Sequence, residues 1–362
     1  MTKGPETLRV HMTGSEWFGA APGGLNRYFT DLYAALARNP EVTVSAAAFG
    51  PPADGGGSWG DIGGSTARRA RTAFLARHAL RDADILDRHF CLYGPPALGP
   101  RGRIPLVVHF HGPWAAESRI TGQGPLAVKA KYFLERLRYA GAARIVVLSN
   151  HFGRLLSDEY GIPAQRIAVL PPGVDLDRFR AEPIPESSRT VLCVRRLERR
   201  MGIDVLLRCW PGVRRVHPDA RLVIVGTGTA ERELRSLAAG LDDRVEFAGR
   251  VDDAGLAELY AGSVCTVAPT VALEGFGLIA LESLAAGRAP IVTDCGGLPD
   301  SVRGLDPSLI VPAKDADALG ARLVAALNGA LPTPAECRAH AATFSWDVTA
   351  ARHLTMYREI TR

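Results

Sequence analysis

The sequence predicts an α/β protein with parallel sheets, divided into two domains. Short apolar runs alternate with longer amphipathic segments along the whole chain, and glycine- or proline-marked turns separate them. Several runs, such as residues 145–148 and 222–225, are apolar throughout, which is typical of strands that helices cover on both faces. A chain of 362 residues is long enough for two such domains, each with its own core.

The predicted strands follow one another along the chain. In the first half they span residues 8–12, 42–48, 83–86, 105–110, 144–149 and 167–170. In the second half they span residues 190–194, 221–225, 245–248, 264–268, 290–293 and 309–311. Because a helical pattern separates most neighbouring runs, each domain should be a parallel sheet flanked by helices.

The domain boundary is predicted from a polar stretch at residues 175–189, which has two prolines and no apolar periodicity. The first domain then covers residues 1–175 and the second covers residues 190–345. Residues 346–362 are predicted to form a final helix, because apolar side chains recur on one stripe of it. The glycine-dense segment 50–64 is expected to be a mobile loop.

The composition excludes several classes of protein. The charged fraction of 22% is ordinary, so disorder is not expected to be the main state. No run of about 18 apolar residues predicts a transmembrane helix, and the first ten residues lack the apolar centre of a signal peptide. The six scattered cysteines are expected to be buried free thiols in a reducing cytoplasm. The net charge of +5 does not indicate nucleic-acid binding, but it suits phosphates or an acidic membrane surface.

Two glycine turns stand at helix starts, where ligands of open α/β sheets bind. The turn with Gly23 and Gly24 opens a helix near Asn26, and it is either an anion site or a plain glycine turn. Residues 225–231 begin like a dinucleotide fingerprint, but Glu231 stands where the third glycine belongs. That match is too weak to predict a nicotinamide enzyme.

A third turn, Glu274-Gly-Phe-Gly277, joins the strand at 264–268 to a predicted helix at 278–286. Glu274 is expected in the turn and Glu282 on the inner stripe of the helix, where two carboxylates can hydrogen-bond sugar hydroxyls. An ordinary solvated helix is the alternative, but the neighbours of Glu282 are apolar. The backbone N–H groups that would form a diphosphate site are those of Gly275, Phe276, Gly277 and Leu278.

His109 and His111 end the predicted strand at 105–110, and their spacing places both side chains on one side. A metal ion would need further ligands, and no neighbouring part of the sequence supplies an obvious one, so no metal site is predicted. Two interpretations of His111 stay open. It contacts a substrate, or it is merely hydrogen-bonded in place.

A basic segment precedes the third predicted strand, with no acidic residue between Asp61 and Asp82. It is either a solvated helix face or a basic, partly apolar helix that lies on an anionic bilayer. Its arginines are Arg68, Arg69, Arg71, Arg77 and Arg81.

In order along the chain, these motifs resemble a family 4 glycosyltransferase. The resemblance implies the GT-B fold, with two facing Rossmann-like domains and a C-terminal helix that crosses back to the first domain. It also implies a retaining reaction with a nucleotide-sugar donor. The motifs are Phe110-His111-Gly112, Arg196-Leu197, Gly226-Thr-Gly228, Gly249-Arg250, the Glu274/Glu282 pair and Cys295-Gly-Gly-Leu-Pro-Asp300.

The resemblance also implies roles for individual residues. Arg196 would hold the donor diphosphate together with the N–H groups of residues 275–278, and Gly24 would approach the phosphates from the first domain. The other implied roles are Glu282 at the ribose, Glu274 at the transferred sugar, Arg250 and Val251 at the nucleobase, and His111 as the active-site histidine.

One departure affects the phosphate site. The family usually has a lysine five residues after the arginine, and this chain has Met201 there. Methionine cannot donate to a phosphate, and a lost charge-assisted contact costs about 1.5–3 kcal/mol. Arg199 or Arg200 is therefore expected to replace the lysine.

The implied function is transfer of a hexose from a nucleoside diphosphate sugar to a hydroxyl acceptor, without a metal or another cofactor. The acceptor is left open between a small molecule, a polysaccharide precursor and a lipid, and no nucleic-acid partner is expected. A cytoplasmic enzyme is expected, with contact at the inner membrane face left open. The alternatives are a nucleotide-sugar epimerase or hydrolase of the same fold, and a catalytically silent sugar-nucleotide-binding protein.

Overall fold

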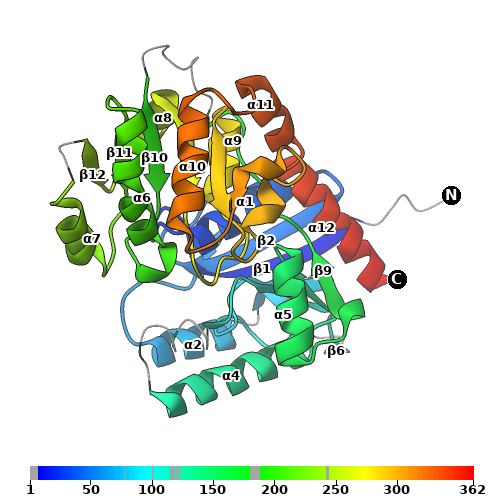
Figure 1. Cartoon of the computed structure of the whole chain (residues 1–362). Coiled ribbons are helices and arrows are strands. Elements are labelled where there is room, and N and C mark those ends of the chain that lie inside the picture. The colour runs from blue at the N-terminus through cyan, green and yellow to red at the C-terminus, as the bar shows by residue number, and fades with distance from the viewer. Residues whose placement is uncertain are drawn as a thin grey trace. The chain divides into compact units, whose positions relative to one another are not determined.

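The computed structural model of the chain describes residues 7–76, 78–99, 102–114, 118, 122, 124–179, 188–241 and 244–362. The chain divides into two compact units. Unit 1 comprises Met1–Gly173 and Trp346–Arg362, and unit 2 comprises Val174–Ser345. Each unit is a parallel sheet with helices against it, so the predicted α/β class is confirmed (Figure 1).

Unit 1 contains a seven-stranded sheet in the order β3-β2-β1-β4-β7-β8-β9, and all its neighbouring strands are parallel. The strands are β1 (Leu8–Glu16), β2 (Val42–Phe49), β3 (Gly57–Ser58), β4 (Ile85–Arg88), β7 (Leu106–Phe110), β8 (Arg144–Val147) and β9 (Ile167–Val169). The helices are α1 (Gly24–Ala37), α2 (Thr66–Leu75), α4 (Pro125–Ala140), α5 (Asn150–Tyr160) and α12 (Trp346–Thr361). A short hairpin, β5 (Leu98–Gly99) with β6 (Gly102–Arg103), stands apart from the sheet.

Unit 2 contains a six-stranded parallel sheet in the order β12-β11-β10-β13-β14-β15. The strands are β10 (Thr190–Val194), β11 (Arg221–Val225), β12 (Val245–Gly249), β13 (Ser263–Ala268), β14 (Ala289–Thr293) and β15 (Ile310–Val311). The helices are α6 (Ile203–Val216), α7 (Glu231–Ala238), α8 (Asp253–Ala261), α9 (Leu278–Ala285), α10 (Ala316–Leu327) and α11 (Pro334–Ala342). This is the strand order of a Rossmann-type sheet.

All the strands predicted from apolar runs are present, because side chains such as Val108, Ile145 and Ile224 are buried between the sheet and its helices. Several predicted boundaries are wrong: β1 extends to Glu16 rather than residue 12, and β4 is Ile85–Arg88 rather than 83–86. At β8 the reason is local. Strand β8 ends at Val147 because the hydroxyl of Ser149 accepts the N–H of Phe152 and so caps the start of α5.

The glycine-dense segment 50–64 contains a strand that the sequence did not predict. Gly57 and Ser58 pair with β2 as the edge strand β3, and the Trp17 indole N–H donates to the carbonyl of Gly57 at 2.9 Å. A side chain on Gly56 would lie 2.5 Å from the Trp17 ring, so glycine permits this close approach. The glycines therefore serve packing as well as turning.

The C-terminal helix α12 belongs to unit 1. It packs against α1, and the Thr349 hydroxyl donates to the carbonyl of Pro171. Of the predicted linker, residues 180–187 lie outside the described residues, while Phe179 is buried against Tyr260 of unit 2.

The six cysteines are free, and five of them are buried, as the sequence predicts. Burial raises the pKa of Cys193 and of Cys265 to about 12, so both thiols stay protonated at neutral pH. None of the described helices is long and apolar enough to cross a membrane.

Candidate functional site

The strand order of unit 2 reverses between β10 and β13, which are neighbours in the sheet. Ligands of open α/β sheets bind at such a point, beyond the carboxyl ends of the strands. The loop after β10 carries Arg195 to Gly202, and the loop after β13 carries Glu274 to Gly277. The sequence-predicted donor residues of both loops are therefore brought to one edge of the sheet.

Glu274 lies in a turn whose backbone is fixed from several sides. Its carbonyl accepts the N–H of Gly297 at 2.9 Å, and a Cβ on Gly296 would lie 2.1 Å from that carbonyl oxygen. The preceding residue, Leu273, has a φ of 53°, which is unusual for a residue with a branched side chain. Strained backbone of this kind persists only where the surrounding structure holds it, and it gathers at functional sites.

The Glu274 carboxylate forms an ion pair with the guanidinium of Arg195, which also donates to the Thr270 hydroxyl. Both side chains are largely buried, with 9% of Arg195 and 14% of Glu274 exposed. The Thr293 hydroxyl donates to the Thr270 carbonyl at 2.6 Å and ties β14 to the same loop. This bracing holds the carboxylate in one position.

Arg195 was missed by the sequence analysis, which singled out Arg196. The structure leaves Arg196 exposed and turns Arg195 toward Glu274. Successive side chains at a strand end point to opposite sides, so the Arg-Arg pair itself signalled that one arginine could face the loop after β13.

The loop after β10 shows how the missing lysine changes the phosphate site. Met201 is only 4% exposed, because its apolar side chain packs into unit 2. Arg200 donates to the Leu273 carbonyl at 2.9 Å, next to Glu274, while the exposed Arg199 pairs with Glu233 on α7 at 3.0 Å. Of the two arginines, Arg200 is the one at the Glu274 turn.

Helix α9 begins directly after this turn. Gly277 has a φ of 87°, and a Cβ there would lie 2.4 Å from a Leu298 methyl carbon, so glycine is required. Phe276 is buried against Phe344, and the first turn of α9 contains no acidic residue. Glu282 is half-buried on the helix. A helix start without an acid suits an anion.

The predicted nucleobase residues follow β12, where Arg250 is exposed and Val251 is half-buried. The glycines of the fingerprint-like turn have a packing role. A Cβ on Gly226 would lie 2.0 Å from the Arg195 carbonyl oxygen, and one on Gly228 would lie 2.3 Å from that of Leu197. The turn thus needs glycine whether or not a dinucleotide binds.

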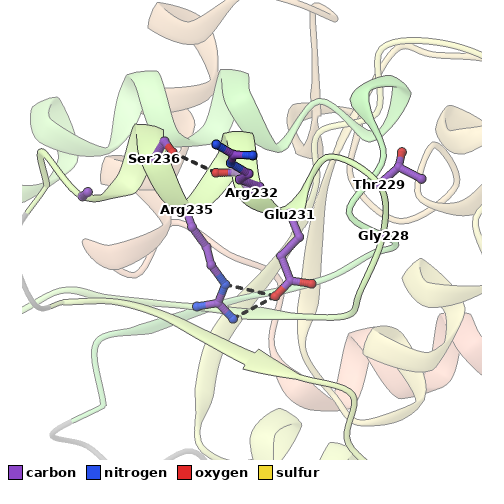
Figure 2. A pocket seen from close by; sticks show the side chains of 7 residues that line it. Gly228, Thr229, Glu231, Arg232, Arg235 and Ser236 are labelled. Carbon is purple, nitrogen blue, oxygen red and sulfur yellow. Dashed lines mark hydrogen bonds and ion pairs between the residues drawn. The ribbon is translucent and has the colours of Figure 1, made fainter.

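A hollow lies at the start of α7, lined by Gly228, Thr229, Glu231, Arg232, Arg235, Ser236 and Ala239 (Figure 2). The Arg235 side chain pairs with Glu231 at 3.0 Å. Gly228 and Glu231 of the fingerprint-like turn line this hollow, but none of the residues with an implied donor or acceptor role does.

In unit 1, the ends of β4 and β7 bring three imidazoles together. His109 and His111 face the same side as predicted, and His89, just after β4, stacks on His109 with ring centroids 3.8 Å apart. The expectation that no further ligand-type side chain lies nearby is therefore wrong. Strand β4 was predicted to end at residue 86, because its apolar run stops there, and this left the polar residues Asp87 and His89 unconsidered.

Asp87 is fully buried beneath these imidazoles. His109 Nε2 lies 3.0 Å from its carboxylate, His89 Nε2 lies 3.5 Å away, and the Tyr357 hydroxyl of α12 donates to it. Burial alone would raise the pKa of Asp87, but His109 and His89 hold it well below its usual range. Asp87 is thus a buried carboxylate that accepts from the Tyr357 hydroxyl and lies close to two imidazole nitrogens.

The three imidazoles are close enough to invite comparison with a metal site, since one nitrogen of each lies within 4.8 Å of the others. Zinc needs nitrogens that converge on one point at about 2.0–2.1 Å. Here the rings of His89 and His109 are inclined by 17°, and those of His109 and His111 also by 17°, so their lone pairs run side by side. This geometry fits a stack of packed imidazole rings better than a metal centre.

We expect acid to destabilise unit 1. Burial lowers the pKa of His11, His109 and His353 from 6.5 to about 4, so the unfolded chain binds protons that the folded chain does not. The stability from each histidine is complete above about pH 6.5 and is lost as pH falls toward 4, at about 3 kcal/mol for each. Urea midpoints measured between about pH 7 and pH 5 should fall steeply. A midpoint that does not change over this range would contradict the prediction.

Gly24 is exposed at the start of α1, where Gly23 has extended backbone and a Cβ would meet nothing within 4 Å. The first turn of α1 contains no acidic residue, which leaves its N–H groups suited to an anion. His111, half-buried at the end of β7, contacts the edge of the Tyr28 ring. Its Nε2 has no hydrogen-bond partner among the described residues.

The basic segment is only partly a solvated face. Arg69 points inward, where it pairs with Glu16 and covers the Phe49 ring at 4.5 Å. Arg68 and Arg71 on α2 are exposed, and Arg77 lies outside the described residues.

Comparisons with known proteins find similar sequences over both units. A model described as Glycosyltransferase Family 4 matches residues 22–178, and one described as Glycosyl transferases group 1 matches residues 188–329. A D-inositol 3-phosphate glycosyltransferase of Acidothermus cellulolyticus is 32% identical over 317 residues, which cover 79% of this chain and 70% of that protein. A phosphatidyl-myo-inositol mannosyltransferase of Mycobacterium leprae is 34% identical over 199 residues, 53% of each chain.

Solved structures share the fold. A sucrose-phosphate synthase of Thermosynechococcus elongatus has a TM-score of 0.74 at 21% identity and covers 98% of this chain and 99% of its own. HepE of Anabaena, solved with UDP and glucose, has a TM-score of 0.75 at 15% identity and covers 97% of this chain and 100% of its own. At such identities the likeness shows the fold alone, and that fold is GT-B.

Proposed function

Because the chain belongs to glycosyltransferase family 4, we propose that it is a retaining, metal-independent hexosyltransferase that uses a nucleoside diphosphate sugar. The observation that carries the proposal is the braced Glu274 carboxylate, which lies between Arg195 and the start of α9 at the strand-order reversal of unit 2. A fixed carboxylate beside an anion site suits a sugar diphosphate. The carboxylate accepts hydrogen bonds from sugar hydroxyls, while the backbone N–H groups at the helix start donate to phosphate oxygens.

The donor is proposed to bind through unit 2. The exposed Arg196 and the N–H groups of residues 275–278 would neutralise the diphosphate, and Arg200 would stand in for the lysine replaced by Met201. Glu282 would bind the ribose, and Arg250 and Val251 would line the base. These fixed donors suffice to stabilise a leaving diphosphate electrostatically, so no metal is required.

In the proposed reaction, the bond between the anomeric carbon and the diphosphate oxygen breaks through an oxocarbenium-like state. An acceptor hydroxyl forms the new bond on the same face, and its proton passes to the departing diphosphate oxygen. Glu274 would hold hydroxyls of the sugar throughout, which keeps the anomeric carbon aligned with the acceptor.

Unit 1 is proposed to bind the acceptor, with His111 as its polar contact. Gly24 of unit 1 is proposed to contact the donor diphosphate. Two relatives are named for D-inositol 3-phosphate and for phosphatidyl-myo-inositol. The acceptor class to test first is therefore a cyclitol hydroxyl, either free or lipid-linked. HepE was solved with UDP, and a Mycobacterium tuberculosis relative is named GDP-mannose-dependent, so both bases belong in the test.

The experiment is a transfer assay with UDP- and GDP-hexoses and inositol acceptors, run with and without EDTA. We expect one donor to give a product with the donor's anomeric configuration, at the same rate in EDTA. Loss of activity in EDTA, restored by a divalent ion, would overturn metal independence. Donor turnover without acceptor would indicate a hydrolase or epimerase, and nucleotide binding without turnover would indicate a silent binding protein.

The two arginines of the phosphate loop allow a matched comparison. We expect Arg200→Ala to weaken nucleoside diphosphate binding by about 10–100-fold, since a hydrogen bond to a charged group contributes about 1.5–3 kcal/mol. Arg199→Ala removes a neighbouring, exposed arginine that pairs with Glu233, and its effect should stay within about twofold. Titration calorimetry measures both. Equal affinities in the two variants would remove Arg200 from the donor site.

A further inference from the structure

Helix α4 presents apolar side chains to solvent. Leu126, Phe133 and Leu137 are 84%, 69% and 73% exposed, more than any other large hydrophobic residue that the structure describes. Together with the exposed Ala130 and Ala140 they form what we call the α4 stripe. The spacing of these residues alternates between four and three, which places all of them on one face of the helix.

The opposite face of α4 already packs on unit 1. Glu135 and Tyr139 are buried, and the Glu135 carboxylate accepts the Trp114 N–H at 3.0 Å and the Tyr160 hydroxyl at 3.1 Å. The helix is therefore anchored through that face, and the α4 stripe is a second, separate apolar surface. An exposed apolar surface of this kind marks an interaction site.

The exposed charges that helix α4 itself carries are positive. Lys129 and Arg136 are exposed seven residues apart along one flank, while Glu135, the helix's single acidic residue, is buried. Helix α2, drawn on the same lower side of unit 1 in Figure 1, adds exposed arginines and the exposed Leu75. A helix that exposes apolar side chains beside its own cations is complementary to a surface that is both apolar and anionic.

We propose that the α4 stripe, with Lys129 and Arg136, docks unit 1 on an anionic lipid surface. The helix would lie in the plane of the interface, with Leu126, Phe133 and Leu137 among the acyl chains and the two cations at the headgroups. A second copy of the chain fits less well. If two α4 stripes paired, Lys129 and Arg136 of one copy would face the equivalent cations of the other copy, or would lack acidic partners there. The proposal does not depend on the reaction proposed above.

Co-sedimentation of the full chain with lipid vesicles tests the proposal. We expect binding to vesicles that contain phosphatidylglycerol, weakened by salt, and little binding to phosphatidylcholine alone. The variant Leu126→Ser/Phe133→Ser/Leu137→Ser should reduce the partition coefficient by at least about a hundredfold. Removal of one cation is expected to reduce the partition coefficient roughly fivefold. Lys129→Glu/Arg136→Glu should reduce it by more than that for each residue, because each cation is replaced by an anion that the lipid repels.

Two control variants carry equal changes elsewhere. Ile62→Ser/Val216→Ser/Leu237→Ser removes three other exposed apolar side chains, and Arg215→Glu/Arg352→Glu changes the net charge by the same amount on other helices. Both should bind as the unchanged chain does, and thermal unfolding verifies that every variant is folded. Equal binding by the α4 stripe variant, or loss of binding in the controls, would overturn the proposal. So would dimerisation through the α4 stripe by a chain that does not bind vesicles.

Discussion

Replacing Glu274 by glutamine is expected to lower the rate of sugar transfer by about 10²–10³-fold while the protein stays folded. Glutamine keeps the size of the side chain but removes the charge, so the ion pair with Arg195 is lost. Arg195 then keeps only its hydrogen bond to the Thr270 hydroxyl at this turn. Under the proposed function, the sugar hydroxyls lose an acceptor at a fixed position. Initial rates with the preferred donor measure the effect.

Glu282→Gln is the matched control for this prediction, because it makes the same change eight residues further along, on α9. If Glu282 binds the ribose, its variant should raise the KM for donor and weaken binding of the free nucleotide. Glu274→Gln should leave nucleotide binding within about threefold, since its proposed contact is with the sugar. A Glu274 variant that transfers sugar at nearly the normal rate would refute the assigned role.

The parts of the fold that were predictable are those where one physical effect dominates. Strands such as β10 and β11 were placed to the residue, because their side chains are buried on both faces and the apolar run ends where the strand ends. The edge strand β3 could not be predicted this way. It consists of Gly57 and Ser58, which have no apolar side chains. It forms because Trp17 and β2, which are distant in the sequence, hydrogen-bond to it.

The candidate site was predictable where a turn and a helix start coincide in the sequence, as at Glu274 and Gly277. The partners of those residues were not. Arg195 lies 79 residues before Glu274, and only the neighbouring positions of β10 and β13 in the sheet bring the two together. Likewise, Tyr357 reaches Asp87 across 270 residues, a contact that no periodicity within either segment reports.

Asp87→Asn is expected to lower the free energy of unfolding by about 3–5 kcal/mol, because it removes the charge from a buried carboxylate that other buried polar groups contact. The carboxylate is fully buried and accepts from the Tyr357 hydroxyl, with His109 Nε2 at 3.0 Å. An asparagine would turn an NH2 group toward at least one of these donors and leave buried groups unpaired. Because Tyr357 lies on α12, this helix should become more accessible to protease.

Asp84→Asn provides the comparison, since it makes the same change three residues earlier, at a position 34% exposed and paired with Arg9 at 2.8 Å. The pair is half-buried, and an asparagine can still accept the Arg9 backbone N–H that Asp84 accepts at 2.9 Å. A partly solvated pair contributes about 1 kcal/mol, so this variant should lose much less stability than Asp87→Asn. Urea unfolding followed by tryptophan fluorescence, which Trp346 at the start of α12 makes informative, separates the two. Equal losses in both variants would mean that the buried carboxylate does not hold α12 to the sheet. A large loss in Asp87→Asn alone, with a smaller loss in Tyr357→Phe, would mean that the buried carboxylate holds α12 to the sheet. Only these two substitutions break the hydrogen bond between β4 and α12.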